Sequence, residues 1–303
     1  MKKNKILIGT RASKLALIYA NRAKDEIAKV FSGKIELIRI TTEGDQNQKE
    51  RLSDIGGKGL FSKKIEEDLI AKKIDLAVHA LKDMPSEETA GLITNCFLKR
   101  SFPEEILITR DKKKLSELNS NSTIGTSSFR REFQLKRIRN DLNYKTIRGN
   151  VDTRISKLNN NDYDGIILSK AGIKSLKLDN LISEEFSTEK IIPSAGQGIV
   201  SLQCRIEDDD IINLLSKVND KVSSISALSE RKVLSILEGD CHTAVGVFSK
   251  VNKNNFEISG ELFSIDGKKR YYKKVKDVPS NFLNASAELG NYLKSEAKDT
   301  YKK

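Results

Sequence analysis

The sequence predicts an α/β protein in which two domains of similar plan precede a smaller α+β domain. Short apolar runs typical of buried strands alternate with amphipathic helical patterns from the N-terminus onward. Strands that alternate with helices predict βαβ units and a parallel sheet. In addition, residues 8–13 (IGTRAS) resemble residues 124–128 (IGTSS), since each reads as a strand, a Gly-Thr turn and a helix-capping serine. This echo favours two doubly wound domains that face one another.

The elements of the first domain come in a regular order. We expect strands at 5–9, 35–40 and 74–78, a helix that begins after Ser13, and a helix around 60–70. Residues 41–59 are polar and rich in glycine, and loops of that length are usually functional or disordered. The middle of the chain repeats the pattern, with strands at 122–125, 144–147, 165–168 and 198–205 and a basic helix at 129–139.

The last part of the chain has a different pattern. Two helices are expected at 208–218 and 224–237, and alternating strands at 256–265 and 269–275 flank Asp266-Gly267, a hairpin signal. A final helix covers about 282–297. This order predicts a small antiparallel α+β domain, and a length of 303 residues agrees with two or three domains.

Charge and composition restrict the class of partner. The 54 basic and 42 acidic side chains give a net charge of +12, which favours nucleic acid, an anionic membrane or an acidic small molecule. No apolar run approaches the roughly 18 residues of a membrane span, and the opening run at 6–8 is too short for a signal peptide. Three cysteines and two histidines predict neither a disulfide framework nor a metal site. We therefore expect a cytoplasmic protein with no metal.

Cationic and hydroxyl side chains gather where the predicted strands end. In doubly wound sheets ligands bind at these ends, where helix N-termini attract anions and arginines bind carboxylates bidentately. The set predicts a cleft for a polyanion, although ordinary caps and solvated helix faces remain the alternative for any single arginine. Its members are Arg11, Lys82, Asp83, Ser127, Ser128, Arg130, Arg131, Arg148 and Arg154.

Two residues in this sequence have a chemical role to explain. Asp83 is the one carboxylate among these cations, and it either caps a turn or stabilises a developing positive charge. Cys241 lies in a loop beside His242, which favours a reactive or modified thiol. Cys96 and Cys204 fall inside apolar patterns and are expected to be inert.

Seven motifs together resemble those of one enzyme family. GTRASKLAL, GGKGLFSKKIE, HALKDMP, GTSSFRR, RGNVDTR, PSAGQGIV and LEGDCHT occur in the order found in porphobilinogen deaminases, also called hydroxymethylbilane synthases, and they span residues 5 to 250. The resemblance implies two domains like those of periplasmic binding proteins and a small α+β domain that carries a cofactor cysteine. The implied bounds are 1–98 with 194–218, then 99–193, then 219–303.

The resemblance also implies the reaction and the roles of residues. Four porphobilinogen molecules would be condensed head to tail into hydroxymethylbilane, with release of ammonia, on a dipyrromethane primer joined by a thioether to Cys241. Asp83 would be the catalytic carboxylate, and Lys58 with Phe61 would lie at the cleft mouth beside loop 42–57. The residues implied to hold carboxylates of cofactor and substrate are Arg11, Ser13, Lys82, Thr126, Ser128, Arg130, Arg131, Arg148 and Arg154. A cytoplasmic monomer without metal, nucleic acid or membrane partner is expected.

Four positions depart from the family pattern. Ala80 stands where serine is frequent, Tyr19 where glutamine is common, Ser175 where arginine is frequent and Asp240 where glycine is frequent. The positive charge that the family often has at the position of Ser175 is either absent from this protein or supplied by Lys174. Two other functions stay open: an anion-binding module without catalysis, which would not need Cys241, and a nucleic-acid binder, which would want aromatic platforms where aromatics make up only 6%.

Overall fold

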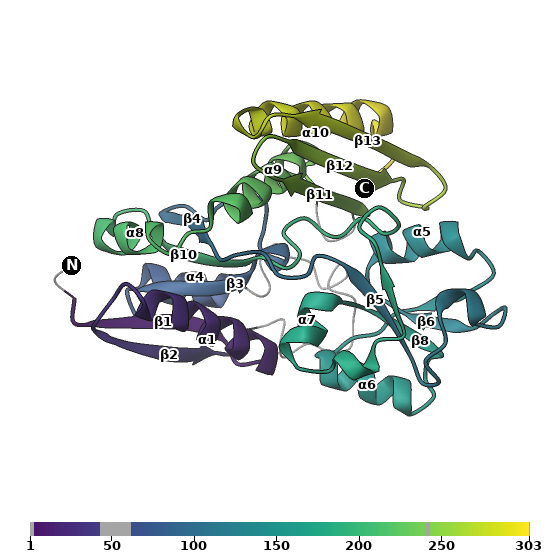
Figure 1. Cartoon of the computed structure of the whole chain (residues 1–303), viewed down its shortest axis with the longest axis horizontal. Coiled ribbons are helices and arrows are strands. Elements are labelled where there is room, and N and C mark those ends of the chain that lie inside the picture. Colours follow the sequence, from purple (N-terminus) through teal and green to yellow (C-terminus); the bar gives the residue numbers. More distant parts are fainter. Residues whose placement is uncertain (1–2, 43–61, 240–242, 303) are drawn as a thin grey trace.

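Three β-sheets organise the chain in the computed structural model, which describes residues 3–42, 62–239 and 243–302 (Figure 1). The first sheet has the strand order β2-β1-β3-β10-β4. Its strands are β1 (Lys5–Arg11), β2 (Lys34–Ile40), β3 (Leu76–Ala80), β4 (Leu92–Phe97) and β10 (Val200–Arg205). β1 runs parallel to β2 and β3, whereas β10 is antiparallel to β3 and β4.

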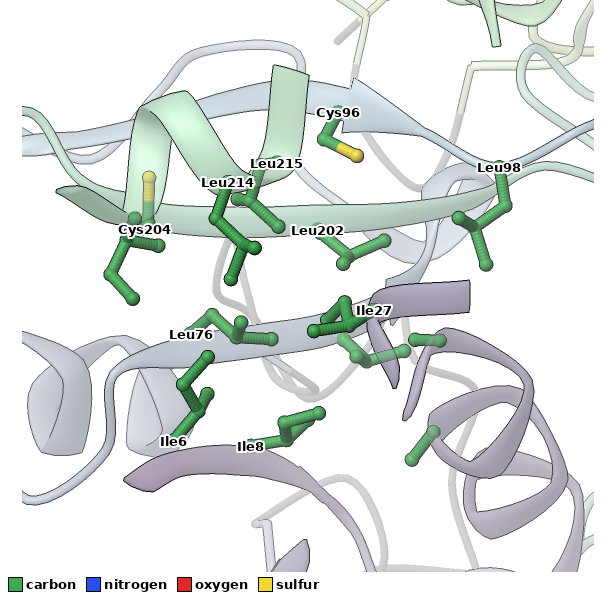
Figure 2. Close-up of a cluster of buried hydrophobic side chains, with 14 of the residues drawn as sticks. Ile6, Ile8, Ile27, Leu76, Cys96, Leu98, Leu202, Cys204, Leu214 and Leu215 are labelled. Atoms are coloured by element: carbon green, nitrogen blue, oxygen red, sulfur yellow. The ribbon is translucent and has the colours of Figure 1, made fainter. Parts of the chain in front are cut away.

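Helices cover both faces of this first sheet. On one face α1 (Lys14–Ala28) and α8 (Asp209–Ser216) pack on the strands through residues such as Ile27 and Leu214, as Figure 2 shows. On the other face α4 (Lys63–Ile70) contributes Ile65 and Leu69 to a second core. Cys96 and Cys204 are buried within the first core, so the prediction that they are buried core residues is confirmed.

The second sheet repeats the plan with residues from the middle of the chain. Its order is β7-β6-β8-β5-β9, made of β5 (Glu105–Thr109), β6 (Thr123–Gly125), β7 (Asn143–Lys145), β8 (Gly165–Ser169) and β9 (Glu184–Phe186). α5 (Phe129–Ile138) contributes Leu135 to the core on one face, while α6 (Val151–Asn159) and α7 (Lys170–Ser175) contribute Leu158 and Ile173 to the other. The predicted fold class, with two doubly wound sheets, is confirmed.

One feature of both large sheets was predicted wrongly. The regular strand–helix alternation predicted parallel sheets, but β10 and β5 run antiparallel to their neighbours. β10 enters the first sheet only after the chain has built the second, so it arrives from the opposite direction. Segments 98–104 and 187–199 form the two connections between the sheets (Figure 1).

The last sheet is antiparallel, as predicted, and is backed by two helices. It consists of β11 (Val245–Val251), β12 (Phe256–Phe263) and β13 (Arg270–Asp277) in that order, with α9 (Lys221–Leu237) and α10 (Phe282–Ala297) packed on it. Short 3₁₀ helices occur at η1 (Leu81–Asp83), η2 (Leu115–Glu117), η3 (Asp179–Leu181) and η4 (Pro279–Asn281). No helix within the described ranges is both long and apolar enough to cross a membrane.

Candidate active site

A cleft with a volume of about 390 Å³ lies between the two large sheets. Its walls come from the end of β1, the start of α1 and η1 on one side and from α5 and α6 on the other, with Ser194 and Gln197 contributed by a connecting segment. The structure brings ten of the predicted site residues to this cleft: Arg11, Ser13, Lys82, Asp83, Ser127, Ser128, Arg130, Arg131, Arg148 and Arg154. The cleft is therefore strongly cationic.

Two equivalent strand–turn–helix units build opposite walls. The Ser13 hydroxyl accepts a hydrogen bond from the Ala16 amide at 3.3 Å and caps α1. In the same way the Ser128 hydroxyl accepts from the Arg131 amide at 3.4 Å and caps α5. Each unit aims the positive end of a helix at the cleft. The similarity between residues 8–13 and 124–128 thus has a structural counterpart.

Lys82 and Asp83 lie in η1, directly after β3. The ammonium of Lys82 donates to Gln197 Oε1 at 3.2 Å. Burial lowers the pKa of Lys82 to about 8, with Arg131 acting in the same direction and Asp83 against it. Asp83 is exposed, and within the described parts of the chain no hydrogen bond to its carboxylate occurs. Its carboxylate is therefore available to a ligand.

A smaller cavity of about 60 Å³ adjoins the cleft and shares Arg11, Ser13 and Asp83 with it. Tyr19 lines this cavity together with Ala80. Burial, and then the charge of Asp83, raise the pKa of Tyr19 to about 12, so the phenol stays protonated. Two of the departures from the family pattern, Tyr19 and Ala80, thus line the same cavity.

Lys174 does not supply to the cleft the positive charge that the family often has at the position of Ser175. Its ammonium pairs with Asp179 and lies over the Phe102 ring, and Lys174 is not among the residues that line the cleft. Of the two alternatives left open by the sequence, the structure therefore favours the absence of this charge from the cleft.

Arg130 and Arg131 have a partner that sequence reasoning missed. Their guanidiniums bind opposite oxygens of Glu105, at 2.6 Å and 2.8 Å, and the Glu105 side chain is fully buried. Although burial opposes ionisation, Arg131 and Arg130 lower the pKa of Glu105 to about 2. Gln197 was missed as well. Glu105 opens an apolar strand and Gln197 lies in a connecting segment, so neither belongs to a cationic pattern in the sequence.

Arg154 is held by a backbone carbonyl, whereas Arg130 and Arg131 are held by a carboxylate. Arg154 donates from Nε to the Gly149 carbonyl at 2.8 Å. Burial lowers the pKa of Arg154 to about 10, and the charges of Arg131 and Arg148 act in the same direction. Burial also lowers the pKa of Arg148. Like charges held this close raise the energy of the empty cleft, so an anionic ligand would relieve it.

Among the predicted residues that the structure describes, Thr126 does not line the cleft. Thr126 is only 1% exposed, and its hydroxyl accepts from the Ser128 amide at 3.2 Å, so it shapes the turn. Lys58, Phe61 and Cys241 lie outside the described residues, as does most of loop 42–57. Among the described residues, no cluster of three or more His, Cys, Asp or Glu side chains is placed to hold a metal ion.

The fold and the cleft define the class as an α/β protein whose two doubly wound sheets enclose a strongly cationic cleft. Similar folds occur in a Salmonella typhimurium periplasmic binding protein with high arginine specificity (15% identity, TM-score 0.42, 73% of this chain and 93% of that one). A methionine-binding protein is similar at 12% identity and a TM-score of 0.43, over 75% of this chain and 95% of that one.

Comparison with known sequences identifies the family. The family model "porphobilinogen deaminase, dipyromethane cofactor binding domain" matches residues 6–213, and the model of the C-terminal domain matches 224–299. A porphobilinogen deaminase of Alkaliphilus metalliredigens is 37% identical over 95% of this chain and 92% of its own. That of Caldicellulosiruptor saccharolyticus is 36% identical over 96% and 99%. The chain belongs to the porphobilinogen deaminase family. The resemblance seen in the motifs is confirmed, together with the enzyme class and the dipyrromethane cofactor.

Proposed function

We propose that this chain condenses four porphobilinogen molecules head to tail into hydroxymethylbilane and releases ammonia at each addition. The observation that carries the proposal is the placement of Asp83 in a cleft lined by five arginines. Each pyrrole of substrate and product carries an acetate and a propionate, so the growing chain is a polyanion. Guanidiniums bind carboxylates with paired, charge-assisted hydrogen bonds, which suits these walls to that ligand.

The same donor set fits the dipyrromethane cofactor. When bound, that group supplies the pyrrole carbon to which the first porphobilinogen is joined, and we propose that Cys241 holds it by a thioether. The carboxylates of cofactor and substrate are assigned to Arg11, Ser13, Lys82, Ser128, Arg130, Arg131, Arg148 and Arg154. Lys58 is assigned to the mouth of the cleft, and Thr126 acts through the turn that positions Ser128.

Asp83 is assigned the catalytic role. Loss of ammonia from the aminomethyl group leaves a positive charge on the substrate pyrrole, and a nearby carboxylate stabilises that charge most when it is already in place. The Asp83 carboxylate is exposed, lines the cleft and directly follows Lys82 in the chain. It would accept pyrrole N–H hydrogen bonds and assist the proton transfers. Asp152 also lines the cleft, but it lies in the first turn of α6 and does not border the smaller cavity.

We further propose that the protein acts as a cytoplasmic monomer without a nucleic-acid or membrane partner. A small-molecule polyanion accounts for the positive charge of the cleft, and the buried thiols of Cys96 and Cys204 suit a reducing compartment. The proposed domains are 1–98 with 194–218, then 99–193, then 219–303. Their support is that the strands of each sheet fall within one of these three sets.

An intact-mass spectrum of the purified protein tests the function. The wild-type protein should carry the mass of two pyrrole units, and Cys241→Ser should show the unmodified mass and make no bilane. Cys96→Ala, which changes a buried cysteine in the first core, serves as the control and should keep the adduct. Normal turnover by Cys241→Ser would overturn the assignment.

A further inference from the structure

Glu105 occupies a particular place behind the cleft. It is the first residue of β5 and its side chain is fully buried. Arg130 Nη2 lies 2.6 Å from Glu105 Oε1, and Arg131 Nη2 lies 2.8 Å from Oε2. Each guanidinium is held a second time, by the carbonyl oxygens of Ile192 at 2.8 Å and Ile167 at 3.3 Å. Both arginines therefore have two fixed points and still border the cleft.

Without such an anchor the two arginines would point apart. They are consecutive residues in the first turn of α5, and neighbouring side chains on a helix do not face each other. Their like charges also repel in a buried setting. Glu105 removes both difficulties, because each of its oxygens holds one guanidinium and its negative charge offsets one of the two positive charges.

The anchor also connects to the opposite wall of the cleft. Lys82 donates to Gln197 Oε1, and the Gln197 amide donates to the Pro103 carbonyl at 2.7 Å, two residues before Glu105. The connection between the sheets thus passes directly from the Gln197 contact into the carboxylate that holds the arginines. The distance between Lys82 and the arginine pair depends on this short stretch of chain.

We propose that Glu105 is a positioning residue that holds Arg130 and Arg131 as one rigid receptor for carboxylates opposite Lys82 and Asp83. The inference rests on the function proposed above. It predicts that removal of the Glu105 charge weakens binding of the substrate, whereas net charge alone predicts stronger binding. Removal of a buried negative charge makes the cleft more positive, which by charge alone would strengthen binding of a polyanion. Loss of the anchor instead misplaces both guanidiniums, which weakens productive binding and slows turnover.

The test compares Glu105→Gln with Glu261→Gln. Glu261 is also a buried carboxylate held between two arginines, Arg137 and Arg270, but it lies on β12 beside a different cavity. Both variants should lower the melting temperature. Only Glu105→Gln should lower kcat/KM for porphobilinogen, on the order of 10- to 100-fold, because small misplacements of positioning groups cost that much. Initial rates should also be measured at low and high ionic strength. A loss of kcat/KM caused by the change in net charge should vary with salt more than a loss caused by misplaced guanidiniums.

Three results would overturn the proposal. They are unchanged kinetics of Glu105→Gln, tighter binding of porphobilinogen by this variant, and an equal loss of kcat/KM in the Glu261→Gln control. Glu105→Asp keeps the charge on a shorter side chain and should retain activity between wild type and Glu105→Gln, and it serves as the test variant if Glu105→Gln does not fold. An intact-mass spectrum of the wild-type protein shows separately whether the primer is present, so failure of the proposed function would be recognised on its own.

Discussion

The cleft arginines differ in the partners that the folded chain gives them. Arg130 and Arg131 bind the carboxylate of Glu105, whereas Arg154 has a hydrogen bond to the Gly149 carbonyl. A guanidinium bound to a protein carboxylate is held in place more firmly, while one bound to a carbonyl keeps its full charge for a ligand. The motifs predicted all of these arginines equally, and only the folded chain separates their roles.

Asp83 offers a prediction at this scale. Asp83→Asn keeps the size of the side chain but loses the charge, so it should fold, bind porphobilinogen and turn over roughly 10²–10³ times more slowly. Asp83→Glu keeps the charge at a displaced position and should be more active than Asp83→Asn. Melting temperature and ammonia release of both variants are the measurements. If Asp83 only capped a turn, the asparagine variant would outperform the glutamate variant.

Lys82 predicts a particular dependence on pH. Its pKa near 8 in the free protein means that the ammonium loses its proton as the pH rises through about 8, so affinity for porphobilinogen should fall there. The stability of the fold should change in the opposite direction. Burial disfavours the charged form, so between about pH 8 and the ordinary pKa of 10.5 the unfolded chain binds a proton that the folded protein has lost. The free energy of unfolding should therefore rise with pH over this range.

The two trends for Lys82 can be measured together. KM and the free energy of unfolding should be followed from pH 7 to 10 in the wild type and in Lys82→Arg. Arginine stays charged over this range, so the variant should show flatter profiles of both quantities. Wild-type and variant profiles of the same shape would show that another group titrates.

At the scale of elements, strand ends and caps place the site while the connections set its width. Ser13 and Ser128 fix the starts of α1 and α5 through local hydrogen bonds, and such signals can be read from a few adjacent residues. The connections are different. Gly198 adopts a φ of +84°, and the Ser101 amide donates to its carbonyl at 2.8 Å, so the two connecting segments are bonded to each other here.

Gly198→Ala should therefore destabilise the protein. A Cβ at this position would lie 3.0 Å from the carbonyl oxygens of Ser101 and Phe102, in addition to the strain of a positive φ. The control is Gly91→Ala, where φ is +82° but nothing lies within 4 Å of an added Cβ. Strain alone costs about 1–3 kcal/mol, and Gly198→Ala should exceed its control in denaturant unfolding. Equal losses would mean that the connecting segments adjust freely.

At the scale of the whole molecule, one buried carboxylate joins the third sheet to both connections. Glu230 of α9 is fully buried and binds the Arg100 guanidinium at 2.6 Å, the Gly196 amide at 2.7 Å, and the Ser249 amide and hydroxyl at 2.9 Å. Arg100 and Gly196 lie in the two connecting segments, and Ser249 lies in β11. The third sheet, which follows the predicted cofactor cysteine in the chain, is thus bonded through Glu230 to both segments that connect the two large sheets.

Glu230→Ala should lower the free energy of unfolding by about 3–5 kcal/mol, because it leaves the buried Arg100 charge without its partner. Hydrogen exchange of β11 should become faster. Glu257→Ala is a suitable control, since Glu257 forms a more exposed pair with Lys274 at 2.8 Å and should change stability by about 1 kcal/mol or less. A loss at Glu230 no larger than in this control would contradict the anchoring role.

The sequence by itself determined the family, the fold class and most cleft residues. These follow from local signals: apolar runs that end in Gly-Thr turns, serines that cap helices, and motifs whose arginines stand at strand ends. Cleft residues such as Arg11 and Arg148 could be predicted because the carboxyl ends of neighbouring strands meet at one edge of a sheet.

Only the tertiary structure decided the direction of β10 and β5, the partner of the paired arginines and the anchor of the third sheet. Arg100 and Glu230 are 130 positions apart in the chain, and Arg130 and Glu105 are 25 apart. Such long-range ion pairs cannot be predicted from the hydrophobic pattern of the sequence. A single glutamate in an apolar run or on a helix gives the same local pattern whether or not an arginine pairs with it in the folded chain. Their energy depends on burial and exact distance, which exist only once distant segments have packed together.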